Sequence, residues 1–314
     1  MKILHITNNY PTPNHPIFGI FVKEQIDSLK TLNIDNDIFF INGREKGKKE
    51  YLLSIKKLRN ILKNNDYDIL HCHHAFSAIL LLLSFSSSKS KRIVSYQNPP
   101  QKEGGVILFM ILKFFYHGLI LKHTKSTSNK IFYLPNGTNV DFFKKYSREE
   151  SLKKLNLDNN KNYIIFMDSN KEKRTQKRVD RFDEVIDILL KNGNPYRIEP
   201  IKLTNTVRNL IPYYFSASAL HLITSDYEGS PNSVKECMAC NIPVVSTPVG
   251  NVNDLIGDID GCYISKSFNS NELAALVIKS LKFKNFNSRE KLFSKNLDIN
   301  SVSKKLLNIY KTIY

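Results

Sequence analysis

The chain has 314 residues, 41% of them hydrophobic, and a formal net charge of +17. This length allows two domains with separate cores, and the apolar content is typical of a globular protein rather than a disordered chain. The excess of 46 Lys and Arg over 29 Asp and Glu favours polyanions, an anionic membrane or phosphorylated ligands, or else reflects the composition of the source genome, and charge alone does not choose among these.

In the first half, apolar strand-like runs alternate with segments of helical periodicity, as in the βαβ units of a parallel sheet. Strands are expected at residues 3–7, 37–41, 68–72 and 92–96, with helices at 18–31, 51–64 and 76–85. The loop before the first helix contains three prolines and Gly19. Such a loop faces the ligand crevice of a doubly wound sheet, so Gly19 either lets a phosphate approach the backbone or simply makes a tight turn.

Residues 106–123 are expected to form one apolar helix with Lys113, His117, Lys122 and His123 along it. Such a helix either lies on a membrane surface or packs against its own sheet. This segment is interrupted by polar residues, and the apolar run 78–85 is too short to span a bilayer. We therefore expect no transmembrane helix.

The first domain is expected to end after residue 145, once a strand at about 131–134 and the turn Pro135-Asn136-Gly137 have passed. A polar helix with Ser147 as its cap opens the second domain, 146–298. The alternation then restarts, with strands at 163–167, 196–201, 219–224, 242–246 and 262–265 and helices at 179–191, 206–215 and 271–282. A final helix is expected at about 299–313.

The stretch from Asp226 to Pro248, DYEGSPNSVKECMACNIPVVSTP, is the most informative part of the chain. It reads as a loop carrying Glu228 and Gly229, then a turn, then a short helix that bears Glu236. Because the first N–H groups of a helix are unsatisfied and its dipole is positive there, this start favours an anion. With two carboxylates beside it to bind hydroxyls, it predicts a site for a phosphate attached to a sugar.

A basic loop at 168–178 follows the first strand of the second domain, and its cations are Lys171, Lys173, Arg174, Lys177 and Arg178. Its position at the carboxyl end of a strand directs these cations toward the same crevice. Cations placed there would stabilise a departing diphosphate more in the transition state than in the ground state. The alternative is an ordinary solvated charge run.

Other chemistries find little support in the sequence. Four cysteines, at positions 72, 237, 240 and 262, lie in or beside apolar runs, so we expect reduced core thiols and a reducing compartment. The DxD pairs at 66–68 and 258–260 and the histidines at 71, 73 and 74 do not make a convincing metal site. No hydrolase elbow, phosphate-binding GK[ST] loop or nucleic-acid motif is recognisable in the sequence, and we expect no secretory signal. We expect a cytoplasmic protein that does not bind nucleic acid.

The whole pattern resembles the GT-B glycosyltransferases, and within them the retaining family 4 enzymes of bacterial surface-polysaccharide synthesis. The segment EGSPNSVKE, Glu228 to Glu236, fits the E-x7-E motif of that family, and ACNIPVVSTPVG after it is also typical. Weaker matches are YPTPNHPIFGIFVKEQ, YLPNGTNVDFF and SASALHLITSDYEG. The resemblance implies two Rossmann-like domains and a last helix, 299–314, that packs back on the first domain.

The resemblance also implies roles for single residues. Glu228 would contact the donor sugar, Glu236 the ribose, and Lys177, with Arg174 from the same loop, the phosphates. The backbone at Gly19 and along Gly229, Ser230, Pro231, Asn232 and Ser233 would approach the sugar and the diphosphate. The expected substrates are a UDP- or GDP-sugar and a saccharide or lipid-linked acceptor, with no cofactor and no obligatory metal.

Two positions depart from the family pattern. Gln97 stands where a histidine usually lines the sugar site, and the segment between Gln97 and Ile131 is short, as though a strand and a helix were missing. The resemblance as a whole still leads us to expect a transferase at the inner face of the cell membrane. The alternatives are a catalytically silent sugar-nucleotide-binding or scaffold subunit of a polysaccharide-assembly complex, and a GT-B sugar-nucleotide epimerase.

Overall fold

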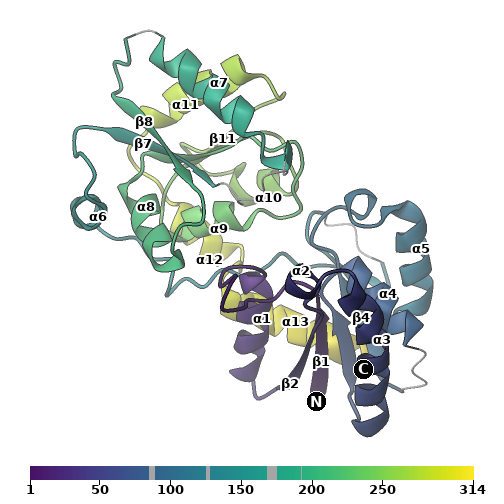
Figure 1. The fold of residues 1–314 in the computed structure, drawn as a ribbon. Coiled ribbons are helices and arrows are strands. Elements are labelled where there is room, and N and C mark those ends of the chain that lie inside the picture. Colours follow the sequence, from purple (N-terminus) through teal and green to yellow (C-terminus); the bar gives the residue numbers. More distant parts are fainter. Residues whose placement is uncertain (85–88, 125–127, 168–174, 192) are drawn as a thin grey trace. The chain divides into compact units, whose positions relative to one another are not determined.

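The computed structural model describes residues 1–84, 89–124, 128–167, 175–191 and 193–314. Two compact units make up the chain: unit 1 is Met1–Gly137 with Ile299–Tyr314, and unit 2 is Thr138–Asp298. Each unit is built on a parallel sheet flanked by helices (Figure 1). The α/β class with two doubly wound sheets, predicted from the alternation of strands and helices, is confirmed.

The sheet of unit 1 has six parallel strands in the order β2-β1-β3-β4-β5-β6. They are β1 (Lys2–Thr7), β2 (Asp35–Phe40), β3 (Ile69–Cys72), β4 (Lys91–Ser95), β5 (Gly118–Leu121) and β6 (Ile131–Tyr133). The helices are α1 (Ile20–Lys30), α2 (Gly43–Lys46), α3 (Lys49–Asn64), α4 (Ala75–Leu83), α5 (Gly105–Phe115) and α13 (Ile299–Ile313). The order reverses between β1 and β3, where doubly wound sheets bind their ligands.

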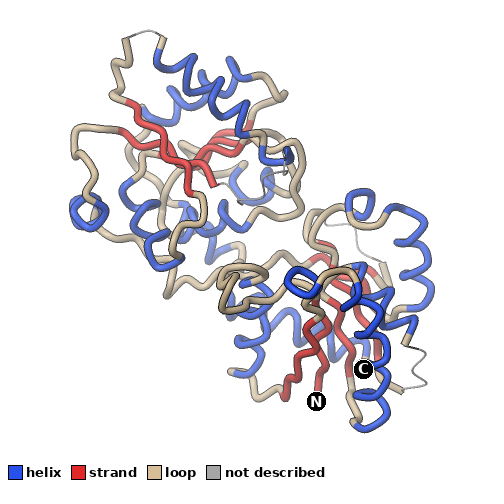
Figure 2. Tube along the Cα trace, viewed as in Figure 1, coloured by secondary structure: helices blue, strands red, loops and turns tan. Residues whose placement is uncertain are grey.

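Helices cover both faces of this sheet, as the tube in Figure 2 shows. On one face, Leu70 and Val94 pack with side chains of α3, α4 and α5, for example Leu58. On the other face, Ile69 and Ile93 pack against α1 and α13. Successive strand residues therefore serve opposite cores, which explains why these strands read as continuous apolar runs.

The single helix predicted at 106–123 is wrong. The structure divides the segment into α5, which ends at Phe115, and the buried strand β5. Tyr116 is extended, with φ −103° and ψ 150°, and so ends the helix. Gly118 follows, where a Cβ would lie 2.7 Å from Cδ1 of Ile313 on α13. Burial between β4 and β6 therefore overrides the apolar, helix-compatible sequence of these residues.

The sheet of unit 2 has five parallel strands in the order β11-β10-β9-β7-β8. They are β7 (Asn162–Met167), β8 (Ile198–Leu203), β9 (Leu220–Ile223), β10 (Val244–Ser246) and β11 (Tyr263–Ile264). The helices are α6 (Arg148–Leu155), α7 (Val179–Leu190), α8 (Ile211–Ala217), α9 (Asn232–Ala239), α10 (Val252–Ile256), α11 (Ser270–Leu281) and α12 (Ser288–Ser294). One face packs on α7 and α11, and the other on α8, α9, α10 and α12.

The division between the units falls after Gly137, earlier than the predicted boundary after residue 145. Val140 and Phe143 explain the difference, because both are buried in the core of unit 2 with Phe215 and Val234. The last helix, α13, belongs to unit 1 and packs against α1.

The cysteines agree with the expectation of reduced core thiols. All four cysteines are free and buried, and burial raises the pKa of the Cys72 thiol to about 12 and that of Cys262 to about 11. They are inert core thiols at neutral pH. Among the described residues, none of the helices has both the length and the apolar character needed to cross a bilayer.

Candidate active site

Glu228 lies at the carboxyl end of the unit 2 sheet, where its carboxylate is held by two partners. Lys177 Nζ donates to Glu228 Oε1 at 2.6 Å, and the Ser225 hydroxyl donates to the same oxygen at 2.8 Å. The glutamate is only 9% exposed. Lys177 ends a short 3-10 turn, Thr175–Lys177, that follows β7 across a gap in the described residues. Two residues 51 positions apart thus form the ion pair that the sequence places on separate loops.

The loop that carries Glu228 is fixed by a close backbone approach. Asn251 N donates to Gly229 O at 3.1 Å. Gly250 has φ +53°, and a Cβ there would lie 2.2 Å from Gly229 O. The glycine is therefore required by its positive φ and by the approach of this carbonyl.

We predict that Gly250→Ala lowers the free energy of unfolding by about 1–3 kcal/mol, because a β-carbon cannot fit without moving the loop of Glu228. Urea denaturation measures this change. Gly193→Ala is the matched control in the same unit, since Gly193 also has a positive φ, +74°, but the described residues beyond its chain neighbours place no atom within 4 Å of the added carbon. Equal destabilisation by the two variants would contradict the role assigned to the Gly229 carbonyl.

Helix α9 begins directly after this loop and presents an anion-binding start. Its N-cap residue, Pro231, makes no side-chain hydrogen bond to the first turn. Lys235 is fully buried and its Nζ donates to Ser230 Oγ at 3.0 Å, while His221 Nε2 lies 3.0 Å from Ser233 Oγ. The positive end of the helix dipole and the Lys235 charge act together, so the segment from Ser230 to Ser233 favours a negatively charged group.

His221 is buried on β9, and its Nδ1 lies 2.9 Å from Ile165 O. Burial lowers the pKa of His221 to about 4. The unfolded chain takes up a proton near pH 6.5 whereas the native site resists it, so stability falls as the pH drops from about 6.5 to 4.

We therefore expect His221 to contribute a slope of about 1.4 kcal/mol per pH unit to the unfolding free energy in this range. Urea denaturation of the wild type and of His221→Gln at pH 7 and pH 5 measures it. Glutamine can bond to both partners, so the variant is expected to fold and to lose less stability between the two pH values. An unchanged loss would contradict this assignment.

Glu236 lies one turn into α9 and faces a cation that the sequence did not single out. Arg208 NH1 is 3.9 Å from Glu236 Oε1. The Arg208 guanidinium lies over the rings of Phe142 and Phe143, 5.2 Å from each centroid. These rings hold Arg208 in place, and the ion pair keeps the carboxylate of Glu236 oriented. No sequence pattern connects these positions.

The structure places the other predicted cations of the basic loop away from Glu228 or does not describe them. Arg174, with Lys171 and Lys173, lies outside the described residues. Arg178 forms ion pairs with Asp180 at 2.7 Å and Asp226 at 3.1 Å. Lys177 is therefore the described cation of this loop that reaches Glu228.

The predicted residues of unit 1 lie at the carboxyl end of its own sheet. At Gly19, φ is +68° and a Cβ would lie 2.3 Å from the backbone of Asn9, so close packing of the loop already requires this glycine. Gln97 follows β4, and its Oε1 accepts from Asn136 Nδ2 at 3.2 Å. Gly19 thus fits the tight-turn interpretation, and a phosphate contact there stays a prediction.

Sequence reasoning missed Glu103, which organises the loop around Gln97. Its carboxylate accepts from the backbone N–H groups of Ala75, Gln97 and Asn98 at 2.8–3.0 Å, and His74 Nε2 lies 3.5 Å away. Burial raises the pKa of Glu103 to about 7, against the effect of these hydrogen bonds. A lone glutamate in QKEGG gives no signal that it binds two backbone N–H groups of its own loop and a third, that of Ala75, 28 residues away.

Two known protein families and several solved structures are similar to this chain. The family described as "Glycosyl transferases group 1" matches residues 177–282, and "Glycosyl transferase 4-like" matches residues 22–98. No curated protein sequence matches the chain. The first match covers Lys177, Glu228 and Glu236 of unit 2, and the second covers Gln97 of unit 1.

Several solved structures share the fold over the full length. Sucrose-phosphate synthase from Thermosynechococcus elongatus is 12% identical with a TM-score of 0.74, covering 100% of this chain and 99% of the other. HepE of Anabaena, in complex with UDP and glucose, is 12% identical with a TM-score of 0.71 and 99% coverage of both chains. The catalytic domain of starch synthase IV from Arabidopsis thaliana, bound to ADP and acarbose, is 11% identical with a TM-score of 0.74 and covers 100% and 99%.

Two doubly wound parallel-sheet units with these structural neighbours define the GT-B fold, as predicted. Each unit also matches a glycosyltransferase family, unit 1 over residues 22–98 and unit 2 over residues 177–282. The chain is a GT-B glycosyltransferase.

Proposed function

We propose that the chain is a retaining family 4 enzyme that moves a sugar from a UDP- or GDP-sugar to a saccharide or lipid-linked acceptor in cell-surface polysaccharide synthesis. One observation carries the proposal: Lys177 Nζ meets Glu228 Oε1 at 2.6 Å beside the start of α9, where the N-cap residue Pro231 makes no side-chain hydrogen bond. A cation, a carboxylate and a helix N-terminus suit a sugar diphosphate. The proposed site needs no metal, because Lys177, Lys235 and α9 supply positive charge.

In the proposed reaction the bond between the anomeric carbon and the diphosphate oxygen breaks, and its electron pair leaves with the diphosphate. Lys177 and the start of α9 stabilise that charge as it develops. The acceptor hydroxyl attacks the anomeric carbon on the same face, and its proton passes to the departing phosphate oxygen. Glu228 accepts hydrogen bonds from sugar hydroxyls and Glu236 from the ribose.

Ligands of the structural neighbours support a nucleoside diphosphate sugar as donor. HepE of Anabaena is described in complex with UDP-glucose, and TarM of S. aureus with UDP. Backbone groups of Gly229, Ser230, Pro231, Asn232 and Ser233 would contact the donor in this chain. The contributions of Arg174, Gly19 and Gln97 remain predictions. Release of nucleoside diphosphate from UDP-, GDP- or ADP-sugars tests the proposal, and no release from any donor would contradict it.

We also propose that unit 1 docks on an anionic membrane that carries a lipid-linked acceptor. Helices α3, α4 and α5 pack side by side and expose large apolar side chains, which we call the apolar surface. Its members are Leu52, Leu53, Phe76, Leu83, Val106, Ile107, Met110, Ile111, Phe114 and Phe115. Ile107 and Phe114 are 79% and 78% exposed. A contiguous apolar patch of this kind typically marks an interaction site.

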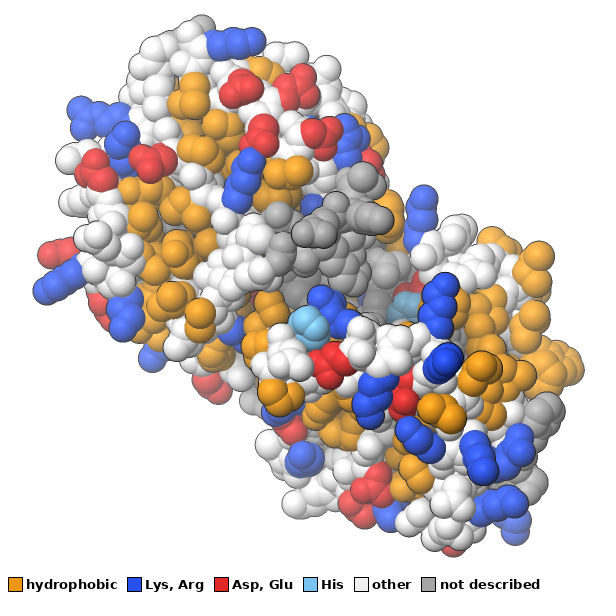
Figure 3. Space-filling model, viewed as in Figure 1, with side chains coloured by type: hydrophobic (Ala, Val, Ile, Leu, Met, Phe, Trp, Pro, Cys, Tyr) orange, Lys and Arg blue, Asp and Glu red, His pale blue; other side chains and the backbone are white. Residues whose placement is uncertain are grey.

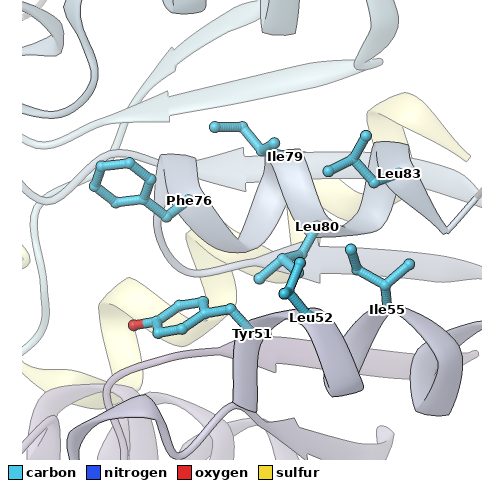
Figure 4. Close-up of a pocket in the computed structure, with 7 residues that line it drawn as sticks. All are labelled: Tyr51, Leu52, Ile55, Phe76, Ile79, Leu80 and Leu83. Atoms are coloured by element: carbon cyan, nitrogen blue, oxygen red, sulfur yellow. The ribbon is translucent and has the colours of Figure 1, made fainter. Parts of the chain in front are cut away.

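A groove of about 390 Å³ lies within the apolar surface (Figure 4). It runs between α3, which contributes Tyr51, Leu52 and Ile55, and α4, which contributes Phe76, Ile79, Leu80 and Leu83. Its lining is almost wholly apolar, so hydrocarbon chains of a lipid suit it better than a soluble saccharide.

The charges around the apolar surface fit an anionic bilayer. On α3, Lys49, Lys56 and Lys63 are exposed at helical spacing beside Leu52 and Leu53. Neither α4 nor α5 contains an acidic residue. Figure 3 shows Lys and Arg next to hydrophobic side chains on this face of unit 1. Lysines at the edge of an apolar patch attract anionic headgroups while the apolar side chains enter the bilayer.

A further inference from the structure

A second polar cluster in unit 1 lies at the carboxyl end of the sheet, on the face covered by α1 and α13. Lys122 directly follows β5, and His73 directly follows β3. Because side chains alternate along a strand, Lys122 lies on the same face as Ile120, which packs against α13. For the same reason His73 lies on the same face as His71. Nδ1 of His71 is 2.6 Å from the Tyr310 hydroxyl of α13. The cluster uses none of the residues assigned to sugar transfer in unit 2.

Lys122 is deeply buried at the carboxyl end of the unit 1 sheet. It is 1% exposed, and its Nζ has no hydrogen-bond partner among the described residues. Burying an unpaired ammonium group costs several kcal/mol of stability, so lysine is an unfavourable choice here unless a ligand completes the site.

His73 offers the complementary group. Asn36 Nδ2 donates to Ile34 O at 2.7 Å, which leaves Asn36 Oδ1 to accept from His5 Nε2 at 2.8 Å. Nδ1 of His5 must then accept from His73 Nε2, at 2.9 Å. In the neutral ring of His73, Nδ1 is therefore an acceptor, and it too is buried with no partner among the described residues.

We propose that Lys122 and His73 form a binding site in unit 1 for a phosphate monoester, in which Lys122 pairs with an anionic oxygen and the phosphate O–H donates to His73 Nδ1. A hydrogen phosphate satisfies both unpaired groups at once and also supplies the negative charge that a buried ammonium group requires, which a water or a neutral hydroxyl does not. A carboxylate or a sulfate pairs with Lys122 but has no proton for His73. The site goes beyond the proposed sugar transfer and does not depend on it.

The titration behaviour of the cluster supports this geometry. Burial lowers the pKa of Lys122 to about 7, and the charge of Glu103 acts in the opposite direction. Burial also holds the pKa values of His71 and His73 well below the usual range, as does the positive charge of Lys122. Both histidines therefore stay neutral at pH 7. His73 must be neutral to accept a hydrogen bond from the phosphate O–H. A bound oxyanion would raise the pKa of Lys122.

The test follows the ε-carbon resonances of ¹³C-labelled lysines by NMR in the full chain. Lys122 is identified as the lysine that titrates near pH 7 and by the loss of its signal in Lys122→Met. Saturating inorganic phosphate, at ionic strength held constant with sodium chloride, is expected to raise the Lys122 pKa by one unit or more. Sulfate and acetate are expected to raise it less. That result would show that a phosphate group binds at Lys122.

Two variants make the test decisive. Lys177→Met is expected to leave the Lys122 response unchanged, which separates this site from the one beside Glu228. His73→Gln is expected to abolish the preference for phosphate over sulfate. A Lys122 pKa that phosphate does not move would overturn the proposal. Equal responses to phosphate and sulfate in the wild type would also overturn it, because they indicate only adventitious ion pairing.

Discussion

Replacing Glu228 by Gln is expected to lower the turnover of sugar transfer by about 100-fold or more, a loss typical of removing one preorganised group from an active site. Glutamine preserves the shape of the side chain but removes the negative charge that Lys177 meets at 2.6 Å. Lys177 is 21% exposed, so water can solvate it in the variant. The unfolding free energy is therefore expected to fall by no more than about 2 kcal/mol.

Initial rates of nucleoside diphosphate release, with donor and acceptor saturating, measure this effect. Glu199→Gln is the matched control, because Glu199 is in the same unit and pairs with Lys161 at 3.5 Å on the surface. Lys177→Met should reduce turnover on its own, and the double variant should lose less than the sum of the two losses. If Glu228→Gln keeps half of the wild-type rate, Glu228 has no role in the reaction. A silent scaffold would keep its partners and its biological effect in this variant.

Replacing both Ile107 and Phe114 by Ser is expected to weaken binding to anionic vesicles by about 100-fold or more. The two side chains are 79% and 78% exposed on α5, so they contribute little to folding. Transfer of each into a bilayer is worth about 1.5–3 kcal/mol, and the two together give about 3–6 kcal/mol. Vesicle co-sedimentation measures the partition coefficient directly.

Val207→Ser is the matched control for this double variant. Val207 is 63% exposed in unit 2, outside the apolar surface, and its loss is expected to leave binding unchanged. Vesicles of neutral lipid should bind the wild type more weakly than anionic vesicles, and added salt should reduce the difference. Retention of the double variant at the wild-type level would show that the apolar surface does not enter the bilayer.

Local signals in the sequence account for much of the fold. The alternation of apolar strands and amphipathic helices predicted both sheets, because a parallel sheet buried on two faces leaves continuous apolar runs. The prediction of one helix at 106–123 failed because continuous apolar runs also occur in buried helices. Four buried residues of β5 are as apolar as α5 before them, and periodicity cannot separate a short buried strand from the continuation of a buried helix.

The candidate site was partly predictable for a different reason. Glu228, Gly229 and the start of α9 are contiguous, so their spacing alone indicates an anion site beside two carboxylates. The contact between Lys177 and Glu228 could be inferred only roughly, from the rule that carboxyl ends of parallel strands share an edge. No such rule predicts the contact between Arg208 and Glu236, because tertiary packing alone brings these two residues together.

Retaining sugar transfer by this chain is tested most directly by ¹H NMR of the reaction with UDP-glucose, GDP-mannose and ADP-glucose, each in the presence of vesicles containing lipid-linked saccharide acceptors. One donor is expected to lose its nucleoside diphosphate while a glycoside with the same anomeric configuration as the donor appears. Glu228→Gln is expected to slow both changes by about 100-fold or more. A product of inverted configuration, or no release of diphosphate from any donor, would contradict the proposed retaining transfer.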